Sequence, residues 1–485
     1  MSLSVLFATS EAYPLVKTGG LADVSGALPA ALSRLGVDVR LVLPRYGDLA
    51  LREDQTTEQV ARIDVLGQPV DILHTVMPDS GVQVYLVDHP TFSARQGNPY
   101  MGPDGNSWHD NPDRFALFAR AAVAVATGAV DSDWRPDVVH ANDWQTGLIP
   151  ALLHEAEKPK TVFTLHNLAY QGIFDRSTFE RLGLPWSLWR ADGLEFWGSM
   201  SFIKGGIVFA DRITTVSPNY AKEIQTPEFG AGLDGLLRHR RDVLVGILNG
   251  IGPDWDPETD EALVANYSRE QLGGKAENKA ALQKELGLPV RDDVPLIVYV
   301  GRLVEQKGSD LLIQALSMLG QREVQFACLG SGERRFEQAL RARADSDPER
   351  IAVRIGYDEG LAHRLEGGGD AFIMPSRFEP CGLNQLYSLK YGTIPIVHHV
   401  GGLADTVIPM TADTLKDGSA TGIVMNHLDV NAILWSIDKF SDLFSRPDDL
   451  ARMRQQAMAQ QYDWGASTRS YIDLYREISP AVPKK

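Results

Sequence analysis

Short, unbroken apolar runs alternate with amphipathic stretches along the whole chain, and this alternation constrains the fold more than any other feature. Strands buried on both faces read as continuous apolar runs, so the runs predict parallel β-strands. Residues Leu21, Val24, Leu28 and Leu32 repeat at the spacing of one helix face. Strand–helix alternation predicts right-handed βαβ units and an α/β fold with doubly wound sheets. The predicted strands are residues 5–8, 39–43, 84–87, 138–140, 162–165, 213–216, 245–248, 296–300, 324–329, 352–355, 371–374 and 394–397.

The middle of the chain holds a segment rich in Gly, Pro and Asp, residues 249–257, which predicts a linker or hinge. About half of the 485 residues lie on each side, and each half has its own predicted strands. We therefore expect two Rossmann-like domains that face each other across a deep cleft. Beyond Pro447 the chain becomes helical, and Tyr471, Leu474, Tyr475 and Ile478 form an apolar stripe that should dock.

The charge balance restricts the partners. Lys plus Arg total 47 and Asp plus Glu total 63, so the net charge is 47 − 63 = −16. A field of this sign opposes nucleic acid and anionic membrane surfaces, whereas neutral partners are compatible with it. Two cysteines, Cys328 and Cys381, rule out a disulfide framework. No uncharged apolar run approaches the length of a membrane span. We expect a cytoplasmic protein without nucleic-acid or membrane partners.

The first candidate site follows the first predicted strand, where Lys17 precedes Gly19 and Gly20 and a helix begins. Ligands of open α/β sheets bind at the carboxyl ends of the strands, so this loop predicts an anion or sugar site with Lys17 as a point charge. The alternative is a solvated lysine before a helix entry. The five residues 19–23 recur as residues 401–405, which could reflect no more than a shared preference for loop-to-helix entries.

In the second half, Arg302 and Lys307 follow the predicted strand 296–300, five residues apart. Together these cations could neutralise a diphosphate; alternatively, they are surface charges, with Arg302 paired to Glu305. Residues 330–335 resemble the start of a dinucleotide-binding G-x-G-x-x-G motif, but Arg335 replaces its third Gly and the following strand lacks an acidic end. NAD and FAD are therefore disfavoured, while a mononucleotide remains possible.

The most informative segment is residues 374–385, in which Glu379 precedes Pro380. Pro suits the first helical turn, so a helix is predicted to begin near Pro380, with Glu379 at its amino end. The N–H groups of Gly382, Leu383 and Asn384 would then form an anion cradle. Glu379 could merely stabilise the helix dipole, or it could bind sugar hydroxyls beside the cradle.

Two predicted strands in the first half end with histidine, at His140 and His166, and both side chains are expected on the cleft side. The alternative is a capped strand end. Neither histidine has the spacing of a metal-binding motif. No G-x-S-x-G nucleophile elbow is present.

Lys17-Thr18-Gly19-Gly20-Leu21-Ala22-Asp23, taken with Arg302, Lys307 and the segment Glu379-Pro380-Cys381-Gly382-Leu383, resembles the bacterial glycogen synthase family over essentially the whole chain. These are ADP-glucose-dependent enzymes of the starch synthase type. The resemblance implies a GT-B fold. Residues 1–248 would form the glucan-acceptor domain and residues 249–460 the nucleotide-sugar domain. Residues 461–485 would form a helix that crosses back to the first domain.

The resemblance also implies site residues. Lys17, Arg302, Lys307, Glu379 and His166 would be catalytic, with Glu379 in the donor-sugar pocket. The eighth residue after Glu379 is Tyr387, where the wider class often has a second Glu, so a two-carboxylate mechanism is doubtful. Tyr100 could stack on an acceptor glucose or anchor its loop. The implied donor-binding set comprises Lys17, Gly19, Gly20, Asp23, Asp143, Asn249, Arg302, Lys307, Tyr357, Cys381, Gly382 and Leu383.

The implied reaction moves glucose from ADP-glucose to the non-reducing 4-hydroxyl of an α-1,4-glucan, which is glycogen or a maltooligosaccharide, and releases ADP. An α-linked donor and product require retention, for which we expect a front-face, oxocarbenium-like path. No metal, pyridoxal phosphate or other cofactor is expected, and the linker should act as the hinge of domain closure. The alternatives are a UDP-glucose-dependent α-glucan synthase or another GT-B transferase, a nucleotide-dependent oxidoreductase, a phosphorylase with pyridoxal phosphate, and a non-enzymatic glucan-binding protein.

Overall fold

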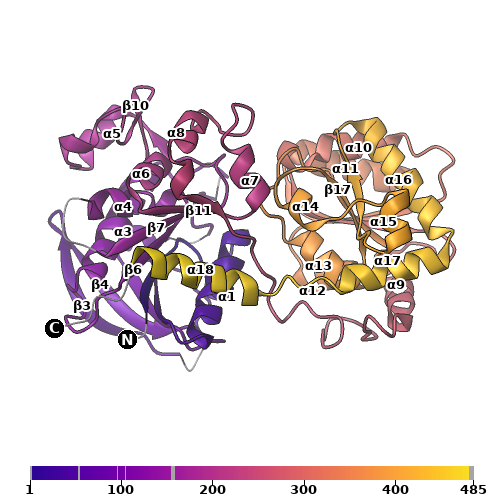
Figure 1. Ribbon diagram of the computed structural model, residues 1–485, viewed down its shortest axis with the longest axis horizontal. Coiled ribbons are helices and arrows are strands. Elements are labelled where there is room, and N and C mark those ends of the chain that lie inside the picture. The colour runs from indigo at the N-terminus through magenta and orange to yellow at the C-terminus, as the bar shows by residue number, and fades with distance from the viewer. Residues whose placement is uncertain (1–2, 53–54, 96, 104, 155–158, 480–485) are drawn as a thin grey trace. The chain divides into compact units, whose positions relative to one another are not determined.

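The computed structural model describes residues 3–52, 55–95, 97–103, 105–154 and 159–479. The chain divides into two compact units (Figure 1). Unit 1 comprises Met1–Gly250 together with Trp464–Lys485, and unit 2 comprises Ile251–Asp463. The chain therefore passes between the units twice, first within the predicted linker. Within unit 2, Ile251 and Asp463 form a β-bridge, and the Ile251 N–H donates to the Tyr462 carbonyl at 2.8 Å.

Unit 1 is built on a nine-stranded sheet in the order β12-β11-β7-β6-β1-β2-β5-β4-β3. The first seven strands of this order are parallel, and β4 and β3 add an antiparallel edge. The strands are β1 (Ser4–Ala8), β2 (Asp38–Pro44), β3 (Glu58–Val65), β4 (Gln68–Val76), β5 (Gln83–Asp88), β6 (Val138–Asn142), β7 (Lys160–Leu165), β11 (Arg212–Thr215) and β12 (Leu244–Gly246). A separate small sheet holds β8 (Ile173–Phe174), β9 (Glu195–Phe196) and β10 (Ser199–Ser201).

The helices of unit 1 include the last helix of the chain, α18, which lies beside α1 (Figure 1). Its stripe residues Tyr471, Leu474, Tyr475 and Ile478 are buried in one core cluster with α1 and β1, which confirms that this segment docks. The helices are α1 (Gly20–Arg34), α2 (Pro90–Ser93), α3 (Asn111–Ala126), α4 (Leu148–Leu153), α5 (Arg176–Arg181), α6 (Phe202–Phe209), α7 (Pro218–Glu223), α8 (Asp234–His239) and α18 (Trp464–Ile478), with short 3-10 turns at Trp144–Thr146, Trp186–Leu188 and Arg241–Val243.

Unit 2 has a six-stranded parallel sheet in the order β15-β14-β13-β16-β17-β18, the order of a dinucleotide-binding Rossmann fold. Along β13, Ile297 and Tyr299 enter one core cluster and Leu296 and Val298 enter another, so helices cover both faces. This double burial explains the unbroken apolar runs of the sequence. The strands are β13 (Leu296–Leu303), β14 (Gln325–Gly332), β15 (Ile351–Ile355), β16 (Ala371–Met374), β17 (Ile394–His398) and β18 (Ile423–Met425).

The helices of unit 2 are α9 (Gly273–Leu286), α10 (Ser309–Ser317), α11 (Arg334–Ser346), α12 (Glu359–Gly368), α13 (Asn384–Tyr391), α14 (Gly401–Thr406), α15 (Ala412–Asp417), α16 (Val430–Phe444) and α17 (Pro447–Met458), with a 3-10 turn at Glu305–Lys307. No helix in the described part of the chain is both long and apolar enough to cross a membrane.

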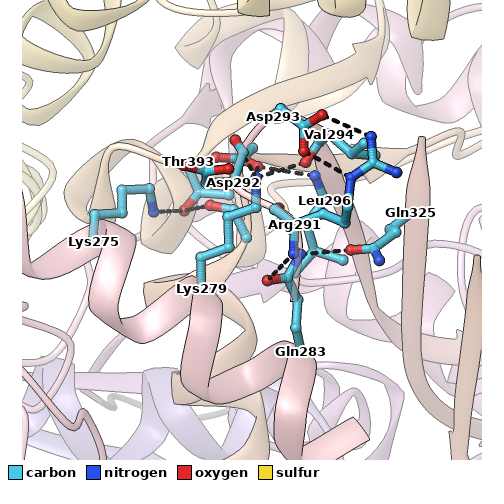
Figure 2. A network of polar contacts seen from close by, with 12 residues as sticks. Lys275, Lys279, Gln283, Arg291, Asp292, Asp293, Val294, Leu296, Gln325 and Thr393 are labelled. Atoms are coloured by element: carbon cyan, nitrogen blue, oxygen red, sulfur yellow. Dashed lines mark hydrogen bonds and ion pairs between the residues drawn. The ribbon is translucent and has the colours of Figure 1, made fainter. Parts of the chain in front are cut away.

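A buried polar network fixes the amino ends of the unit 2 strands. Lys279 of α9 donates to the Val294 carbonyl at 2.6 Å, and Lys275 donates to the Thr393 hydroxyl at 2.6 Å (Figure 2). Lys279 also pairs with Asp370 at 2.7 Å, and the Asp370 carboxylate accepts the Leu296 N–H at 2.9 Å. The network therefore ties α9 to the starts of β13, β16 and β17. The opposite, carboxyl edge of the sheet is the one at which ligands of such folds bind.

Candidate active site

The loops after β1 and β6 meet at the topological switch point of unit 1. β1 pairs with β2 on one side and with β6 on the other, so the chain continues in opposite directions from this centre. Ligands of open α/β sheets bind at such a point. Here Lys17 pairs with Asp23, in the first turn of α1, at 2.8 Å, and each side chain is about a quarter exposed. Gly19 and Gly20 stand at the start of α1.

A carboxylate that the sequence reasoning missed lies beneath this loop. The Glu11 side chain accepts the N–H groups of Thr18 and Gly19 at 2.5 and 3.3 Å, and the hydroxyl of Tyr100 at 3.1 Å. Glu11 is only 3% exposed. The Gly19 N–H is therefore not presented to a ligand, contrary to the expectation from the double glycine. Gly20 is the first residue of α1, where the N–H groups have no partner within the helix.

The next loops hold Asp143 and His166 together. The Asp143 carboxylate accepts the His166 N–H at 2.8 Å, and Asp143 has a φ of 58°, a conformation rare outside glycine. Asn142 donates its amide N–H to the Ala8 carbonyl, so its oxygen must accept from His166 Nε2 at 2.9 Å. His166 Nε2 thus carries the proton and Nδ1 a lone pair. Burial lowers the pKa of His166 to about 3, so the imidazole is neutral.

His140 does not reach the carboxyl edge, and the prediction that it faces the cleft is wrong. Its strand continues to Asn142, and His140 itself is fully buried. One ring nitrogen contacts the Tyr475 hydroxyl of α18 at 2.6 Å, and the other contacts the Thr164 hydroxyl at 2.5 Å. His140 is a satisfied core histidine that fixes α18 on the sheet.

Tyr100 and Asn249 also belong to unit 1. The Tyr100 hydroxyl lies on Glu11 and on Ser10, at 2.8 Å from the Ser10 hydroxyl, which are the contacts of a loop anchor. Stacking of Tyr100 on an acceptor glucose stays a prediction. Asn249 is 6% exposed, and its side-chain oxygen has no hydrogen-bond partner among the described residues. An orphaned buried acceptor of this kind suits a group that binds a ligand hydroxyl.

The buried Glu11 carboxyl predicts a pH-dependent stability. Burial raises the pKa of Glu11 to about 7 from its ordinary value of 4.5, and the Asp23 charge adds to the rise, although the Thr18 and Gly19 N–H groups and the Tyr100 hydroxyl oppose it. Burial raises the pKa of Asp143 to about 7 as well, and the Glu11 charge adds to that rise. Across this pH interval the folded state holds a proton that the unfolded state has lost.

The contribution of Glu11 to the free energy of unfolding is therefore full below about pH 4.5 and lost as the pH rises to about 7. Glu11→Gln cannot titrate, so its stability relative to the wild type should increase from pH 4.5 to pH 7.5. Urea unfolding of both proteins at five pH values measures this difference. A difference that does not change with pH would contradict the prediction.

In unit 2, Lys307 and Glu379 form an ion pair at the switch point between β13 and β16. Lys307 Nζ lies 2.5 Å from Glu379 Oε2, and the Ser376 hydroxyl donates to the same oxygen at 2.9 Å. The side chains are 21% and 7% exposed, so the carboxylate is almost fully withdrawn from water. Both contacts fall on Oε2, and Oε1 can accept a ligand hydroxyl. The sequence reasoning did not include Ser376, although it lies three residues before Glu379.

The second double glycine, Gly401 and Gly402, packs against the backbone of Glu379. The Gly402 N–H donates to the Glu379 carbonyl at 3.1 Å. Gly401 has a φ of 45°, and a Cβ atom there would lie 1.8 Å from the same carbonyl oxygen. The recurring segment 401–405 therefore begins a helix directly against Glu379. A residue larger than glycine at position 401 would clash with the Glu379 backbone.

The helix after Glu379 begins later than predicted. α13 starts at Asn384 rather than near Pro380, and Gly382 has a φ of 70°, which helical backbone excludes. Pro380 lies in the connecting loop, so Glu379 is not in the first helical turn. The N–H groups at the start of α13 still lack intrahelical partners, and the buried Cys381 and the partly buried Leu383 lie between them and Glu379 in the chain.

Arg302 and Tyr357 extend from the same edge of the sheet. Arg302 is exposed and donates to the Gln306 side chain at 3.3 Å, whereas Glu305, its expected alternative partner, pairs with Arg335. Tyr357 follows β15 and is 72% exposed. Its hydroxyl donates to Glu359 at 2.8 Å. An exposed aromatic ring of this kind can offer a face on which a base stacks.

The partial G-x-G motif has a packing role. A Cβ atom on Gly330 would lie 2.2 Å from the Gly301 carbonyl oxygen, and one on Gly332 would lie 2.3 Å from the Leu303 carbonyl oxygen. These glycines let the carboxyl ends of β13 and β14 pair closely. Close pairing brings the loop with Arg302 and Lys307 over the sheet edge.

The candidate residues thus lie in both units. In unit 1, Lys17 pairs with Asp23, and the Asp143 carboxylate holds the His166 N–H. In unit 2, Lys307 pairs with Glu379, and Arg302 contacts Gln306. Within the ranges that the structure describes, no group of three or more His, Cys, Asp or Glu side chains could hold a metal ion.

Comparisons with known proteins match both units to known families. Residues 4–239 match the starch synthase catalytic domain family, and residues 283–459 match the family of glycosyl transferases group 1. Curated glycogen synthases of Thioalkalivibrio sulfidiphilus and Cellvibrio japonicus are each 51% identical to the chain; the alignments cover 98% of this chain and 100% and 99% of those proteins. The catalytic domain of starch synthase IV from Arabidopsis thaliana, bound to ADP and acarbose, superposes with a TM-score of 0.90 at 31% identity and covers 99% of this chain and 100% of that one.

The two Rossmann-like units and their matched families define a glycosyltransferase of the GT-B class, as predicted. At 51% identity over nearly its whole length, the chain belongs to the glycogen synthase family. It is a hexosyl-transferring enzyme of glycogen synthesis, and the prediction of its family and activity is confirmed.

Proposed function

We propose that this enzyme transfers glucose from ADP-glucose to the 4-hydroxyl at the non-reducing end of an α-1,4-glucan, with retention of configuration and release of ADP. The observation that carries the proposal is the Lys307–Glu379 pair at the switch point of unit 2. There the Lys307 ammonium donates to the Glu379 carboxylate. An ammonium suits a phosphate, and a carboxylate suits sugar hydroxyls. The solved relative bound to ADP and acarbose, an oligosaccharide-like ligand, supports the same pairing of substrates.

Unit 2 would hold the donor. Arg302 and Lys307 would bind the diphosphate, with the N–H groups at the start of α13 adding partial positive charge. Glu379 would accept hydroxyls of the glucose through Oε1. Tyr357 would stack on adenine, and Gly382 and Leu383 would line the sugar side.

Unit 1 would supply Lys17, as added positive charge near the phosphates, and the neutral His166 at the glucose. A protonated imidazole would repel positive charge that develops at the anomeric carbon, so the lowered pKa of His166 favours the transition state. The Asp143 carboxylate would hold the backbone N–H of His166 and would also contact the sugar. Asn249 would hydrogen-bond to a sugar hydroxyl, and Tyr100 would stack on a glucose of the acceptor.

The proposed reaction takes place on one face of the glucose. The bond from C1 to the phosphate oxygen breaks, and its electron pair leaves with ADP while the glucosyl carbon becomes oxocarbenium-like. The acceptor 4-oxygen then bonds to C1 from the same face and gives its proton to the departing phosphate. Arg302 and Lys307 stabilise the charge on the leaving group. Retention follows because bond breaking and bond formation share that face.

The test is incubation of the enzyme with glycogen and either ADP-glucose or UDP-glucose, each labelled in the glucose. We expect label in the polymer and equimolar ADP from the first donor, and release of that label by an enzyme specific for α-1,4 links. Label from UDP-glucose instead would select the alternative donor. Free labelled glucose without polymer label would contradict transfer.

A further inference from the structure

We propose that Glu11 is a positioning residue for this glucosyl transfer: its buried carboxylate holds the loop of Lys17 and the loop of Tyr100 in one arrangement. The inference rests on the proposed role of Lys17 and assigns a function to a residue outside the motifs singled out in the sequence.

The first arm of this carboxylate grips the lysine loop. Glu11 Oε2 accepts the N–H groups of Thr18 and Gly19, the two residues that directly follow Lys17. Two adjacent N–H groups on one oxygen fix the direction of the backbone there. Lys17 itself contacts Asp23 at 2.8 Å, so its ammonium is placed by the backbone that Glu11 holds and by the first turn of α1.

The second arm grips the tyrosine loop, which lies far away in the sequence. Glu11 Oε1 accepts the Tyr100 hydroxyl at 3.1 Å, and that hydroxyl accepts in turn from Ser10 at 2.8 Å. The backbone of Tyr100 is fixed independently, since its carbonyl accepts from the Asn111 side chain at 3.0 Å. One carboxylate therefore spans two loops whose residues are proposed to act on the donor and on the acceptor.

The carboxylate is itself held firmly. The Thr9 hydroxyl donates to the Glu11 carbonyl at 2.9 Å and contacts Ser25 of α1 at 2.8 Å. The Tyr46 hydroxyl donates to the Ser10 carbonyl at 2.9 Å. At 3% exposure Glu11 is shielded from solvent, so its part is to orient other groups rather than to contact a substrate.

This role depends on hydrogen-bond geometry and not on charge. The amide of Gln can accept the Thr18 and Gly19 N–H groups through its oxygen and donate to the Tyr100 hydroxyl through its nitrogen. Asp keeps the charge but is one methylene shorter, so its carboxylate cannot reach both loops. Positioning by Glu11 therefore predicts that Glu11→Gln is tolerated and Glu11→Asp is not. A charge-based role predicts the reverse order.

The experiment measures kcat and KM for ADP-glucose and for glycogen in Glu11→Gln, Glu11→Asp, Lys17→Gln and the Glu11→Asp/Lys17→Gln double variant. Glu180→Asp, the same change on the exposed surface of α5, is the control. We expect kcat/KM of Glu11→Asp to fall about 100-fold, as for small displacements of a reacting group. Glu11→Gln should stay near the wild type, and the double variant should lose less than the product of the two single losses, because part of the effect of Glu11 acts through Lys17.

Two outcomes overturn the inference while leaving the proposed function intact: an active Glu11→Asp, or a double variant whose loss is the product of the single losses. A fully active Lys17→Gln would instead remove Lys17 from the proposed function, and this inference with it. Hydrogen exchange needs no variant that might unfold. In the wild type the Thr18 and Gly19 amides should be protected, and fast exchange at both would overturn the inference even if Glu11→Asp failed to fold.

Discussion

Glu379→Gln should lower kcat by about 10²–10³-fold while leaving the protein folded. The carboxylate is 7% exposed and accepts from Lys307 and Ser376 through Oε2. A Gln amide oxygen can take over these two contacts, so the local structure should survive. What the variant loses is the negative charge and an acceptor toward the sugar, both of which matter most when positive charge develops at the anomeric carbon. Steady-state kinetics with ADP-glucose and glycogen measure the loss.

The same position separates two retaining mechanisms. If Glu379 were a nucleophile, Glu379→Ala would open space beneath the sugar, and azide would restore ADP release and yield an inverted glucosyl azide. The front-face path predicts no such rescue. Glu349→Gln, at an exposed carboxylate two residues before β15, is the matched control and should keep normal turnover. Normal kcat in Glu379→Gln would remove this residue from the proposed site.

The predicted strands were recovered because parallel strands covered on both faces leave unbroken apolar runs. The strand pair β3 and β4 escaped prediction for the opposite reason. Its first residues, Glu58, Gln59 and Val60, are exposed, and its turn is Leu66-Gly67, with a φ of 54° at Leu66 rather than an Asn or Gly at that position. Neither continuity nor a common turn signal marks such a hairpin. Short β18 was missed because three residues give no readable pattern.

The places of the candidate residues in the fold were predictable where position after a strand carries the information, as for Lys17, Lys307 and Glu379. They were not predictable where a side chain acts through a backbone group elsewhere. Glu11 acts on the N–H groups of residues seven and eight positions later, a contact that no spacing rule encodes. The start of α13 was misplaced because Pro380 suits a first helical turn, while the left-handed Gly382 that delays the helix cannot be told from other glycines.

Lys307→Gln should lower kcat by about 10²–10³-fold, because it removes one of two cations proposed to stabilise the leaving diphosphate. From the sequence alone we would expect little effect on folding. The structure changes this expectation, since the Lys307 ammonium is the cationic partner of a carboxylate that is 7% exposed. Breaking such a pair from one side leaves a buried charge, so the variant should also lose up to about 3 kcal/mol of unfolding free energy.

A double-mutant cycle separates the two effects. Lys307→Gln/Glu379→Gln leaves no buried charge, so its free energy of unfolding should return toward the wild-type value, whereas its turnover should stay at least as low as that of either single variant. Urea unfolding and steady-state kinetics on the same four proteins provide both readouts, with Lys416→Gln on exposed α15 as the control. If the double variant is as unstable as Lys307→Gln, the stranded carboxylate is not the cause of the instability. If stability returns together with turnover, the pair serves the fold alone, and the diphosphate must be held by other groups.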